Sequence, residues 1–480
     1  MKHEIPPVES ADVAVIGGGP AGLMAAIAAA EAGARVILAE QLSRPGVKLL
    51  ATGGGRCNLT NTLPADDFMA RCGRQGRFMH PALGAMDSGG LRTFLDALGV
   101  PTHAPDGFHV YPVSDSARTV QQALVGRALT LGVAVRLGLC VTGLWLEERE
   151  AGSVSEKPKK GAAASSKKRG KASSEILSQK CGTPALGRAN DEKHSRGVAA
   201  ATATYKTPDF VLRGVETSGG PLAAPRVILA SGGRSYPDLG ATGTGYELAR
   251  QAGHTVTDLV PALVSLETRE AWPARCAGVS LSPARVWIDL PRQPRAGITG
   301  DILFTHRGIS GPAVLDLSGD VSVLLVGGEV PLRIDLVPGS SEEEWVSRFD
   351  HWQVRGGATT FVTLLDHYLP RSLATVLCGL AGITPAIRPS QVARPARQAL
   401  AELLTALPLT GTATEGWAAS MVTRGGVTLR EVDPRTLASR LLPGLAFAGE
   451  ILDLDGPSGG FNLQWAFSSG HLAGAHAAGL

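Results

Sequence analysis

The stretch DVAVIGGGPAGLMAAIAAAEAGARVILAE, residues 12–40, decides the fold of this 480-residue chain. Its first apolar run, Val13–Ile16, predicts a buried parallel strand, and the Ala-rich segment that follows predicts a helix ending near Gly33. Three glycines at G-x-G-x-x-G spacing lie between them, and a second apolar run ends in Glu40. In dinucleotide-binding folds the first glycine makes the turn, the second admits a pyrophosphate and the third lets helix and strand pack closely. The stretch therefore predicts a βαβ unit that binds a dinucleotide.

The contacts of that dinucleotide can be predicted from the same stretch. The first helical turn presents free N–H groups and a positive dipole end to the phosphates. Glu40 stands where a carboxylate accepts both ribose hydroxyls and repels a 2′-phosphate. The predicted contacts are Gly17, Gly19, Pro20, Ala21, Gly22, Glu40 and Gln41.

Length and composition narrow the class of protein. A chain of 480 residues that is 44% hydrophobic can fill the cores of two or three domains. No apolar run reaches the ~18–20 residues of a membrane span, and the first residues carry no signal-peptide core. The six cysteines include no C-x-x-C pair, as is typical of reduced thiols. We expect a cytoplasmic protein without membrane or metal sites.

Residues 150–206 differ from the rest of the chain. From position 151 to 206 there are 12 Lys/Arg against 4 Asp/Glu, so the other residues carry a net charge of about −5. The segment is rich in Lys, Ser, Ala and Gly and lacks apolar periodicity, which predicts a disordered insertion between strands at 141–147 and 210–215. A basic arm for nucleic acid or an acidic partner is the alternative. Because the remaining chain is acidic, we do not expect a nucleic-acid partner.

A second glycine cluster lies in KLLATGGGRCNLTN, residues 48–61. Three consecutive glycines flanked by cationic and amide side chains predict a loop whose backbone approaches a ligand. A mobile surface turn is the alternative. The predicted ligand contacts here are Lys48, Thr52, Gly53, Gly54, Gly55, Arg56, Cys57 and Asn58.

Four motifs together resemble a family of bacterial flavoproteins labelled NAD(P)/FAD-dependent oxidoreductases, which includes aminoacetone oxidase-like and bile-acid reductase-like members. They are GGGPAG at 17–22, KLLATGGGRCNLTN at 48–61, FTHRGISGP at 304–312 and GEILDLDGPSGGFNLQWA at 449–466. The resemblance runs from Ala11 to Ala477, except for the basic segment. It implies an α/β fold: a discontinuous Rossmann-like FAD-binding domain with an inserted β-barrel-like domain and a small helical subdomain.

Domain boundaries follow from this resemblance and from the strand and helix patterns. We expect the FAD-binding domain at 1–149, 207–262 and 429–480, and the barrel-like domain at 263–340 and 408–428. The helical insert is expected at 341–407. The FTHRGISGP loop is either a pocket wall or a tight structural turn.

The resemblance also implies further contacts to a non-covalently bound FAD. A helix that begins near Asn462 would direct its positive end at the flavin and stabilise negative charge at N1 and O2 on reduction. These contacts are Val141, Ser231, Gly232, Gly233, Gly449, Glu450, Asp453, Gly459, Gly460, Asn462 and Leu463.

The expected function is oxidation or reduction of a small organic substrate by hydride transfer at flavin N5, with NAD(P)H as a candidate electron donor. Two alternatives stay open: an FAD-containing RNA-modification protein that docks RNA through the basic segment, and a flavin-bearing binding module without turnover. The catalytic candidates are Arg56, Asn58, His306 and Arg307. Three single histidines, His80, His103 and His109, are expected to be polar surface or core residues.

Overall fold

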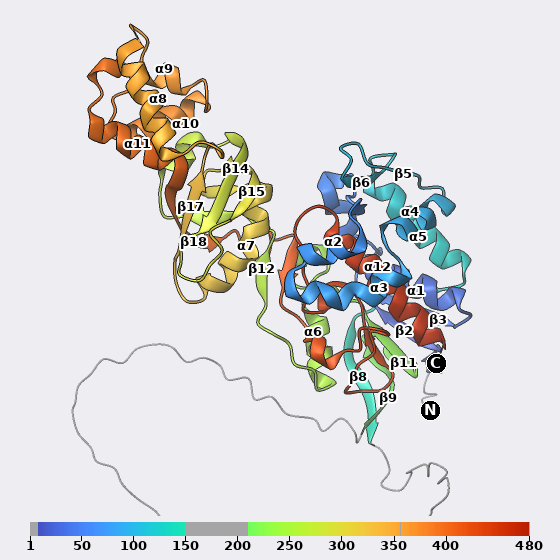
Figure 1. Ribbon diagram of the computed structural model, residues 1–480. Coiled ribbons are helices and arrows are strands. Elements are labelled where there is room, and N and C mark those ends of the chain that lie inside the picture. The colour runs from blue at the N-terminus through green and yellow to red at the C-terminus, as the bar shows by residue number, and fades with distance from the viewer. Residues whose placement is uncertain (1–7, 149–209, 356, 480) are drawn as a thin grey trace, which may run out of the picture. The chain divides into compact units, whose positions relative to one another are not determined.

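A computed structural model describes residues 8–148, 210–355 and 357–479. The predicted disordered insertion at 150–206 lies outside the described residues. The architecture is α/β, as the sequence predicts, and contains a closed barrel (Figure 1).

A parallel five-stranded sheet in the order β20-β11-β2-β3-β7 carries the glycine-rich unit. Three of its strands are buried along their whole length, as expected when helices cover both faces of a parallel sheet. Its strands are β2 (Val13–Ile16), β3 (Val36–Glu40), β7 (Ala134–Leu137), β11 (Arg226–Leu229) and β20 (Leu445–Phe447).

Two helices of this domain pack unusually closely. The helix α1 (Pro20–Glu31) follows the glycine turn, and α12 (Phe461–Gly479) closes the domain. A Cβ atom on Gly470 would lie 2.3 Å from the backbone oxygen of Ala21, and one on Gly474 would lie 2.2 Å from that of Ala25. Glycine at both positions therefore lets α12 lie directly on α1.

A second sheet, in the order β1-β10-β9-β8, flanks the first. Its long antiparallel pair places Glu148 opposite Phe210. The two chain ends that border residues 149–209 therefore lie side by side. The strands are β1 (Glu9–Ser10), β8 (Val141–Glu148), β9 (Phe210–Thr217) and β10 (Gly220–Ala223).

Between β3 and β7 the chain forms short elements that surround the second glycine cluster. A small three-stranded sheet, β4-β6-β5, lies among short helices. The elements are the 3-10 helices Lys48–Gly55 and Gly73–Met79, β4 (Thr60–Asn61), α2 (Ala65–Arg71), α3 (His80–Ala85), α4 (Ser88–Ala97), β5 (Thr102–His103), β6 (His109–Pro112) and α5 (Ala117–Thr130).

Six strands close into a barrel in the order β13-β16-β15-β14-β17-β18, and α7 (Pro312–Leu325) packs against it. The barrel core is apolar and continuous with that of the helices inserted between its last two strands. The strands are β13 (Leu266–Thr268), β14 (Ser280–Ile288), β15 (Ile298–Phe304), β16 (Gly308–Ser310), β17 (Val330–Asp335) and β18 (Leu407–Thr414).

The inserted helices are held together by a buried aromatic cluster. Trp345, Phe349 and Phe361 have no exposed surface. The ring centre of Phe349 lies 5.7 Å from that of Trp345 and 5.2 Å from that of Phe361. The helices are α8 (Glu342–Arg355), α9 (Phe361–Leu365), α10 (Arg371–Leu380) and α11 (Arg394–Ala406).

Three further elements link the barrel to the parallel sheet. The strand β12 (Val260–Ala262) pairs with β19 (Val422–Arg424), so the segments that enter and leave the barrel region lie together. The helix α6 (Thr244–Gln251) follows the return strand β11.

Candidate cofactor and active site

A cavity of about 790 Å³ opens at the carboxyl ends of β2, β3 and β11. This is the edge at which open parallel sheets bind ligands. The glycine turn after β2, the 3-10 helix Lys48–Gly55 and the segment before α12 form its walls.

The three glycines of the first turn have three different environments. Gly17 has a φ of +102°, and a Cβ atom there would lie 2.6 Å from the backbone oxygen of Ala230. A Cβ atom on Gly22 would lie only 1.8 Å from the backbone oxygen of Gly17, whereas one on Gly19 would meet nothing within 4 Å. Gly17 and Gly22 thus serve the fold, and the space beside Gly19 belongs to the cavity.

The start of α1 has the properties of an anion site. Gly19 is its N-cap, Pro20 is its first residue, no side chain caps it, and its first turn contains no acidic residue. The free N–H groups and the positive helix end therefore face the open space beside Gly19, which fits a pyrophosphate.

Glu40 is buried at the end of β3 and lines the same cavity. Its Oε2 accepts a 2.6 Å hydrogen bond from the N–H of Gly18, and its Oε1 accepts one of 2.8 Å from Leu42. Each carboxylate oxygen can accept a further hydrogen bond. The backbone thus orients the carboxylate, and its remaining acceptor capacity fits a ribose diol.

A partly buried ion pair links the second glycine cluster to the C-terminal segment. Lys48 Nζ lies 2.7 Å from Glu450 Oε2 and 2.7 Å from Ser235 Oγ. Glu450 Oε1 accepts hydrogen bonds of 2.8 Å from Ser235 Oγ and from the N–H of Thr423. Burial raises the pKa of Glu450, but Lys48 and these donors outweigh it and hold that pKa below its usual value. Glu450 is therefore ionised at neutral pH.

The triple-glycine loop adopts left-handed backbone conformations. Gly53 and Gly54 have φ values of +56° and +65°, and a Cβ atom on Gly54 would meet nothing within 4 Å. Cys57, with a φ of +66°, has a fully buried thiol, and that burial raises its pKa to about 12. In the orientation that gives both polar atoms of the Asn58 side-chain amide a partner, its nitrogen donates to the carbonyl of Thr60 and its oxygen accepts from the N–H of Gly460.

The loop before α12 is held in place by amide side chains. Asn462 Oδ1 accepts a 2.9 Å hydrogen bond from the N–H of Gly456, and its Nδ2 donates to the carbonyl of Gly456 at 2.8 Å. Asn61 Nδ2 donates to the carbonyl of Gly459 at 2.9 Å. Amide side chains from α12 and β4 therefore hold the loop at the cavity wall.

Most of the predicted contact residues line this one cavity, although they come from five separate stretches of sequence. They are Gly17, Gly19, Pro20, Ala21, Glu40, Gln41, Lys48, Thr52, Gly53, Gly54, Asn58, Val141, Ser231, Gly232, Glu450, Gly459, Gly460, Asn462 and Leu463.

The other predicted contact residues lie around the cavity without lining it. A Cβ atom on Gly233 would clash with Thr423, and one on Gly449 would clash with Ala21, so both glycines serve packing. Arg56 is exposed, with its guanidinium 4.5 Å from the centre of the Tyr111 ring. The full set outside the lining is Gly22, Gly55, Arg56, Cys57, Gly233, Gly449 and Asp453.

The catalytic candidates His306 and Arg307 also lie away from the cavity. Both are exposed in the turn between β15 and β16, and Arg307 forms an ion pair with Glu267. Of the two interpretations of FTHRGISGP, the geometry matches the structural turn. The last two residues of the motif are Gly311, whose φ is +95°, and Pro312, at which α7 begins.

Sequence reasoning missed an apolar end of the cavity. Tyr236, Leu263, Leu315, Met421 and Val422 line it, together with the residues already named. They come from loops, from α7 and from β19, and their sequence carries no periodic signal that could have grouped them.

It also missed a histidine–carboxylate pair beside the loop before α12. His109 Nδ1 lies 2.5 Å from Asp106 Oδ2. A Cβ atom on Gly459 would lie 3.5 Å from His109 Nε2, so this nitrogen faces the residue that lines the cavity. The pairing of an acid with a histidine three positions later was the available signal.

The described ranges contain neither a cluster of metal ligands nor a helix that could span a membrane. Within residues 8–148, 210–355 and 357–479, no three His, Cys, Asp or Glu side chains gather as metal ligands. None of the helices in those ranges is long and apolar enough to cross a membrane.

The parallel sheet, the open glycine turn and the acid at the end of β3 are features of a dinucleotide-binding protein. The chain belongs to the HI0933-like family: the model of the HI0933-like protein Rossmann domain matches residues 11–168 and 195–476. This confirms the family resemblance seen in the sequence motifs, and the chain is a flavin-dependent oxidoreductase.

Two curated relatives match nearly full length. A 3-dehydro-bile acid delta(4,6)-reductase from Clostridium scindens is 32% identical over 469 residues, 97% of this chain and 98% of that protein. A ribosomal RNA dihydrouridine synthase from Escherichia coli is 29% identical over 466 residues, 96% of each chain. Among solved structures, a 3-ketosteroid-delta4-(5alpha)-dehydrogenase from Rhodococcus jostii matches 99% of both chains at 16% identity, with a TM-score of 0.46.

Proposed function

We propose that the chain is an FAD-dependent reductase that saturates a carbon–carbon double bond conjugated to a carbonyl group in a small organic molecule. The observation that carries this proposal is the apolar end of the cavity, formed by Tyr236, Leu263, Leu315 and Met421. It offers an uncharged ring the burial that small-molecule sites provide.

The names of the two relatives support the reaction class. One denotes reduction of ring double bonds in a 3-oxo steroid acid, and the other denotes formation of a dihydrouracil base. Both reactions add a hydride and a proton across a ring C=C bond that a carbonyl group polarises. Because the two relatives act on different substrates, we carry over to this chain the class of reaction that they share and neither of their substrates.

The proposed cofactor contacts are the residues that line the cavity. The start of α1 would hold the pyrophosphate, and Glu40 would hold the adenosine ribose. The Lys48–Glu450 pair and the loop at Gly459 would meet the flavin half. When bound and reduced by an electron donor, for which we propose NAD(P)H, the flavin would supply the hydride at N5.

The second half of the reaction needs a proton, and we propose that the imidazolium form of His109 delivers it from Nε2. Asp106 accepts a hydrogen bond from the imidazole and two more from the backbone N–H groups of Phe108 and His109. The hydrogen bond with the His109 side chain lowers the pKa of Asp106 most, and the two backbone hydrogen bonds lower that pKa further. Asp106 therefore stays ionised and orients the ring, leaving Nε2 directed toward Gly459.

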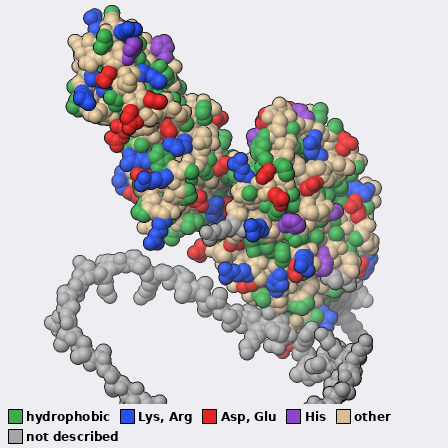
Figure 2. All heavy atoms as spheres, in the orientation of Figure 1, with side chains coloured by type: hydrophobic (Ala, Val, Ile, Leu, Met, Phe, Trp, Pro, Cys, Tyr) green, Lys and Arg blue, Asp and Glu red, His purple; other side chains and the backbone are tan. Residues whose placement is uncertain are grey.

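The name of the second relative favours one further candidate, a uracil base in RNA. RNA binding requires a basic surface that neutralises phosphates. Outside positions 151–206 the chain has 34 Lys/Arg against 39 Asp/Glu. On the face that Figure 2 shows of the part with the parallel sheet, basic side chains are interspersed with acidic ones. These observations favour the small-molecule substrate.

Anaerobic flavin spectroscopy tests the proposal. The purified protein is reduced with NADH or NADPH, or with dithionite if neither acts, and then mixed with cyclohexenone, progesterone or a short uridine-containing RNA hairpin. We expect reoxidation by an enone, a product two hydrogens heavier, and no reoxidation by cyclohexanone. His109→Gln should still bind FAD but turn over at least tenfold more slowly. Reoxidation by the hairpin alone would establish the RNA alternative, and no reoxidation by any probe would reject enone reduction.

A further inference from the structure

The helix α7 of the barrel region reaches the cavity through consecutive residues. Leu315 lines the cavity. The next residue, Asp316, accepts a 2.7 Å hydrogen bond at Oδ1 from the N–H of Ser458, which also lines the cavity. One turn later, Asp320 forms an ion pair with Arg424 of β19. One face of α7 therefore carries two carboxylates toward the loop before α12.

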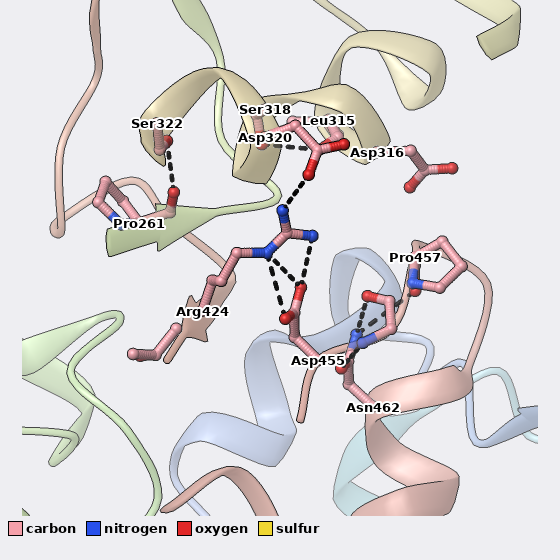
Figure 3. Close-up of polar contacts among 12 residues, drawn as sticks. Pro261, Leu315, Asp316, Ser318, Asp320, Ser322, Arg424, Asp455, Pro457 and Asn462 are labelled. Atoms are coloured by element: carbon pink, nitrogen blue, oxygen red, sulfur yellow. Dashed lines mark hydrogen bonds and ion pairs between the residues drawn. The ribbon is translucent and has the colours of Figure 1, made fainter. Parts of the chain in front are cut away.

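Arg424 lies between α7 and that loop (Figure 3). Its Nη1 lies 2.5 Å from Asp320 Oδ1, while its Nε and Nη2 both donate to Asp455 Oδ2 at 3.1 Å. The Asp455 side chain is 10% exposed and that of Arg424 29%, whereas Asp320 is 58% exposed. The Arg424–Asp455 pair is thus shielded from solvent, and screening weakens it less than a surface pair.

The sequence of α7 is adapted to this contact. A Cβ atom on Gly319 would lie 2.6 Å from Arg424 Cζ, so glycine lets the guanidinium lie against the helix. The helix is itself anchored, because Ser318 Oγ accepts from the N–H of Val264 and Ser322 Oγ donates to the carbonyl of Pro261. Arg424 and Asp316 therefore connect the loop to a helix that is fixed.

The loop at 455–460 has two kinds of support. Asn462 and Asn61 bind its Gly456 and Gly459 from the side of α12 and β4. On the other side, Arg424 binds Asp455, and Asp316 binds Ser458. Removing the second support would leave the loop held from one side only, next to the cavity wall that it forms.

We propose that Asp316 and Arg424 are positioning residues that hold the 455–460 loop, and with it the start of α12, in register with the flavin ring. The proposal rests on the proposed placement of FAD in the cavity. Donor groups at a helix start stabilise charge only within about one turn, so a displaced loop would weaken their effect on the reduced flavin. Because Leu315 lies on the same helix, a displaced contact would also alter the apolar end of the cavity.

The variants are chosen so that none leaves a buried charge without its partner. Asp316→Ala removes the acceptor for Ser458, whereas Asp316→Asn keeps an oxygen there and serves as the conservative rescue. The double variant Arg424→Gln/Asp455→Asn removes the ion pair as a unit. The matched control is the double variant Arg285→Gln/Asp335→Asn, which removes an ion pair of 3.1 Å in the barrel whose exposures of 37% and 8% are close to those of the Arg424–Asp455 pair.

Each variant is purified with FAD, and its flavin content, visible circular dichroism, midpoint potential and KM and kcat for the active enone are measured. Asp316→Ala and the double variant should retain FAD and fold, change the visible dichroism and bind reduced relative to oxidised flavin about tenfold more weakly. That ratio lowers a two-electron potential by about 30 mV. Their KM should rise at least fivefold, with a smaller change in kcat. Asp316→Asn and the Arg285→Gln/Asp335→Asn control should match the wild type.

Unchanged potential and dichroism in flavin-replete Asp316→Ala and double variants would overturn the proposal. Equal shifts in the Arg285→Gln/Asp335→Asn control would also overturn it, because they would reflect general loosening of the barrel. If the double variant fails to fold, Asp316→Ala against Asp316→Asn decides alone. Potential and dichroism need no substrate, so they remain decisive even if no enone proves to be reduced.

Discussion

Gly19 and Gly22 of the same motif differ in the space available for a side chain, and that difference can be tested. A side chain at Gly19 would enter empty space beside the start of α1, while one at Gly22 would overlap the backbone oxygen of Gly17. Gly19 has a φ of −72°, which any residue adopts. We therefore predict that Gly19→Val folds normally but purifies without FAD, because the valine occupies the space of the pyrophosphate.

Gly22→Ala is the matched comparison for Gly19→Val. Overpacking of this kind typically costs about 1–3 kcal/mol, so its apoprotein should have a lower melting temperature than wild-type apoprotein. The measurements are flavin absorbance per protein and apoprotein melting. Full flavin content in Gly19→Val would mean that the turn does not hold the pyrophosphate.

Cys57 stands beside the triple-glycine loop but is predicted to have no redox role. Its thiol is fully buried, and burial raises its pKa to about 12, so almost no thiolate exists at neutral pH. Cys57→Ser should keep most of the turnover. In the native protein a thiol reagent should label the exposed Cys140 and leave Cys57 unlabelled until denaturation. Loss of turnover in folded, flavin-replete Cys57→Ser protein would contradict this interpretation.

Sequence patterns located single residues well where one motif contains the whole interaction. The glycine turn and Glu40 are close in sequence, so spacing alone predicted that they would lie together, and both line the cavity. The partners of Lys48 are not: Ser235 lies 187 positions away and Glu450 lies 402 positions away. Long-range hydrogen bonds of this kind depend on the tertiary fold and leave no periodic signal. His306 and Arg307 are the opposite case. They belong to a conspicuous motif and were catalytic candidates, but that motif forms an exposed turn outside the cavity lining.

At the scale of elements, strongly patterned segments were predictable. The first strand and helix follow from apolar runs and an Ala-rich segment, and the structure places them at Val13–Ile16 and Pro20–Glu31. The closed order of the barrel could not be read from the sequence, since β13 and β16 are only three residues long. Such short strands owe their pairing to the shared core.

The start of α12 allows a prediction about the flavin itself. The N–H groups of Asn462 and Leu463 lie in the first turn, and both residues line the cavity. Asn462→Pro removes one of these donors while proline remains tolerated in a first helical turn. A helix end contributes about 0.3–1 kcal/mol, and up to ~2 kcal/mol when partly buried. We expect retained FAD and a midpoint potential lower by roughly 10–40 mV.

The Asn462 side chain complicates that variant, because it also binds Gly456. Asn462→Ala is therefore the control, since it loses the side-chain bonds and keeps the N–H group. The difference in potential between the proline and alanine variants isolates the backbone donor. Equal potentials in these two flavin-replete proteins would mean that this N–H group does not act on the flavin.

At the scale of the whole molecule, charge and topology separate one segment from the rest. Positions 151–206 carry a net charge of +8, and the described strands on either side pair directly, with Glu148 opposite Phe210. A short turn can therefore connect β8 to β9 without moving either strand. By loop-closure entropy, shortening a connection of ~56 residues to ~7 should stabilise the fold by about 2 kcal/mol.

Replacing residues 151–204 with a short Gly/Ser turn consequently tests both the predicted insertion and the choice of substrate. If the substrate is a small molecule held in the cavity, the shortened protein should keep its flavin, its KM and its kcat for the enone, and its isoelectric point should fall. If the basic segment docks RNA, the shortened protein should bind an RNA hairpin more weakly, and the salt dependence of binding should decrease, because fewer phosphate contacts release counterions. Loss of enone reduction in a folded, flavin-replete protein would mean that the segment contributes to the active site.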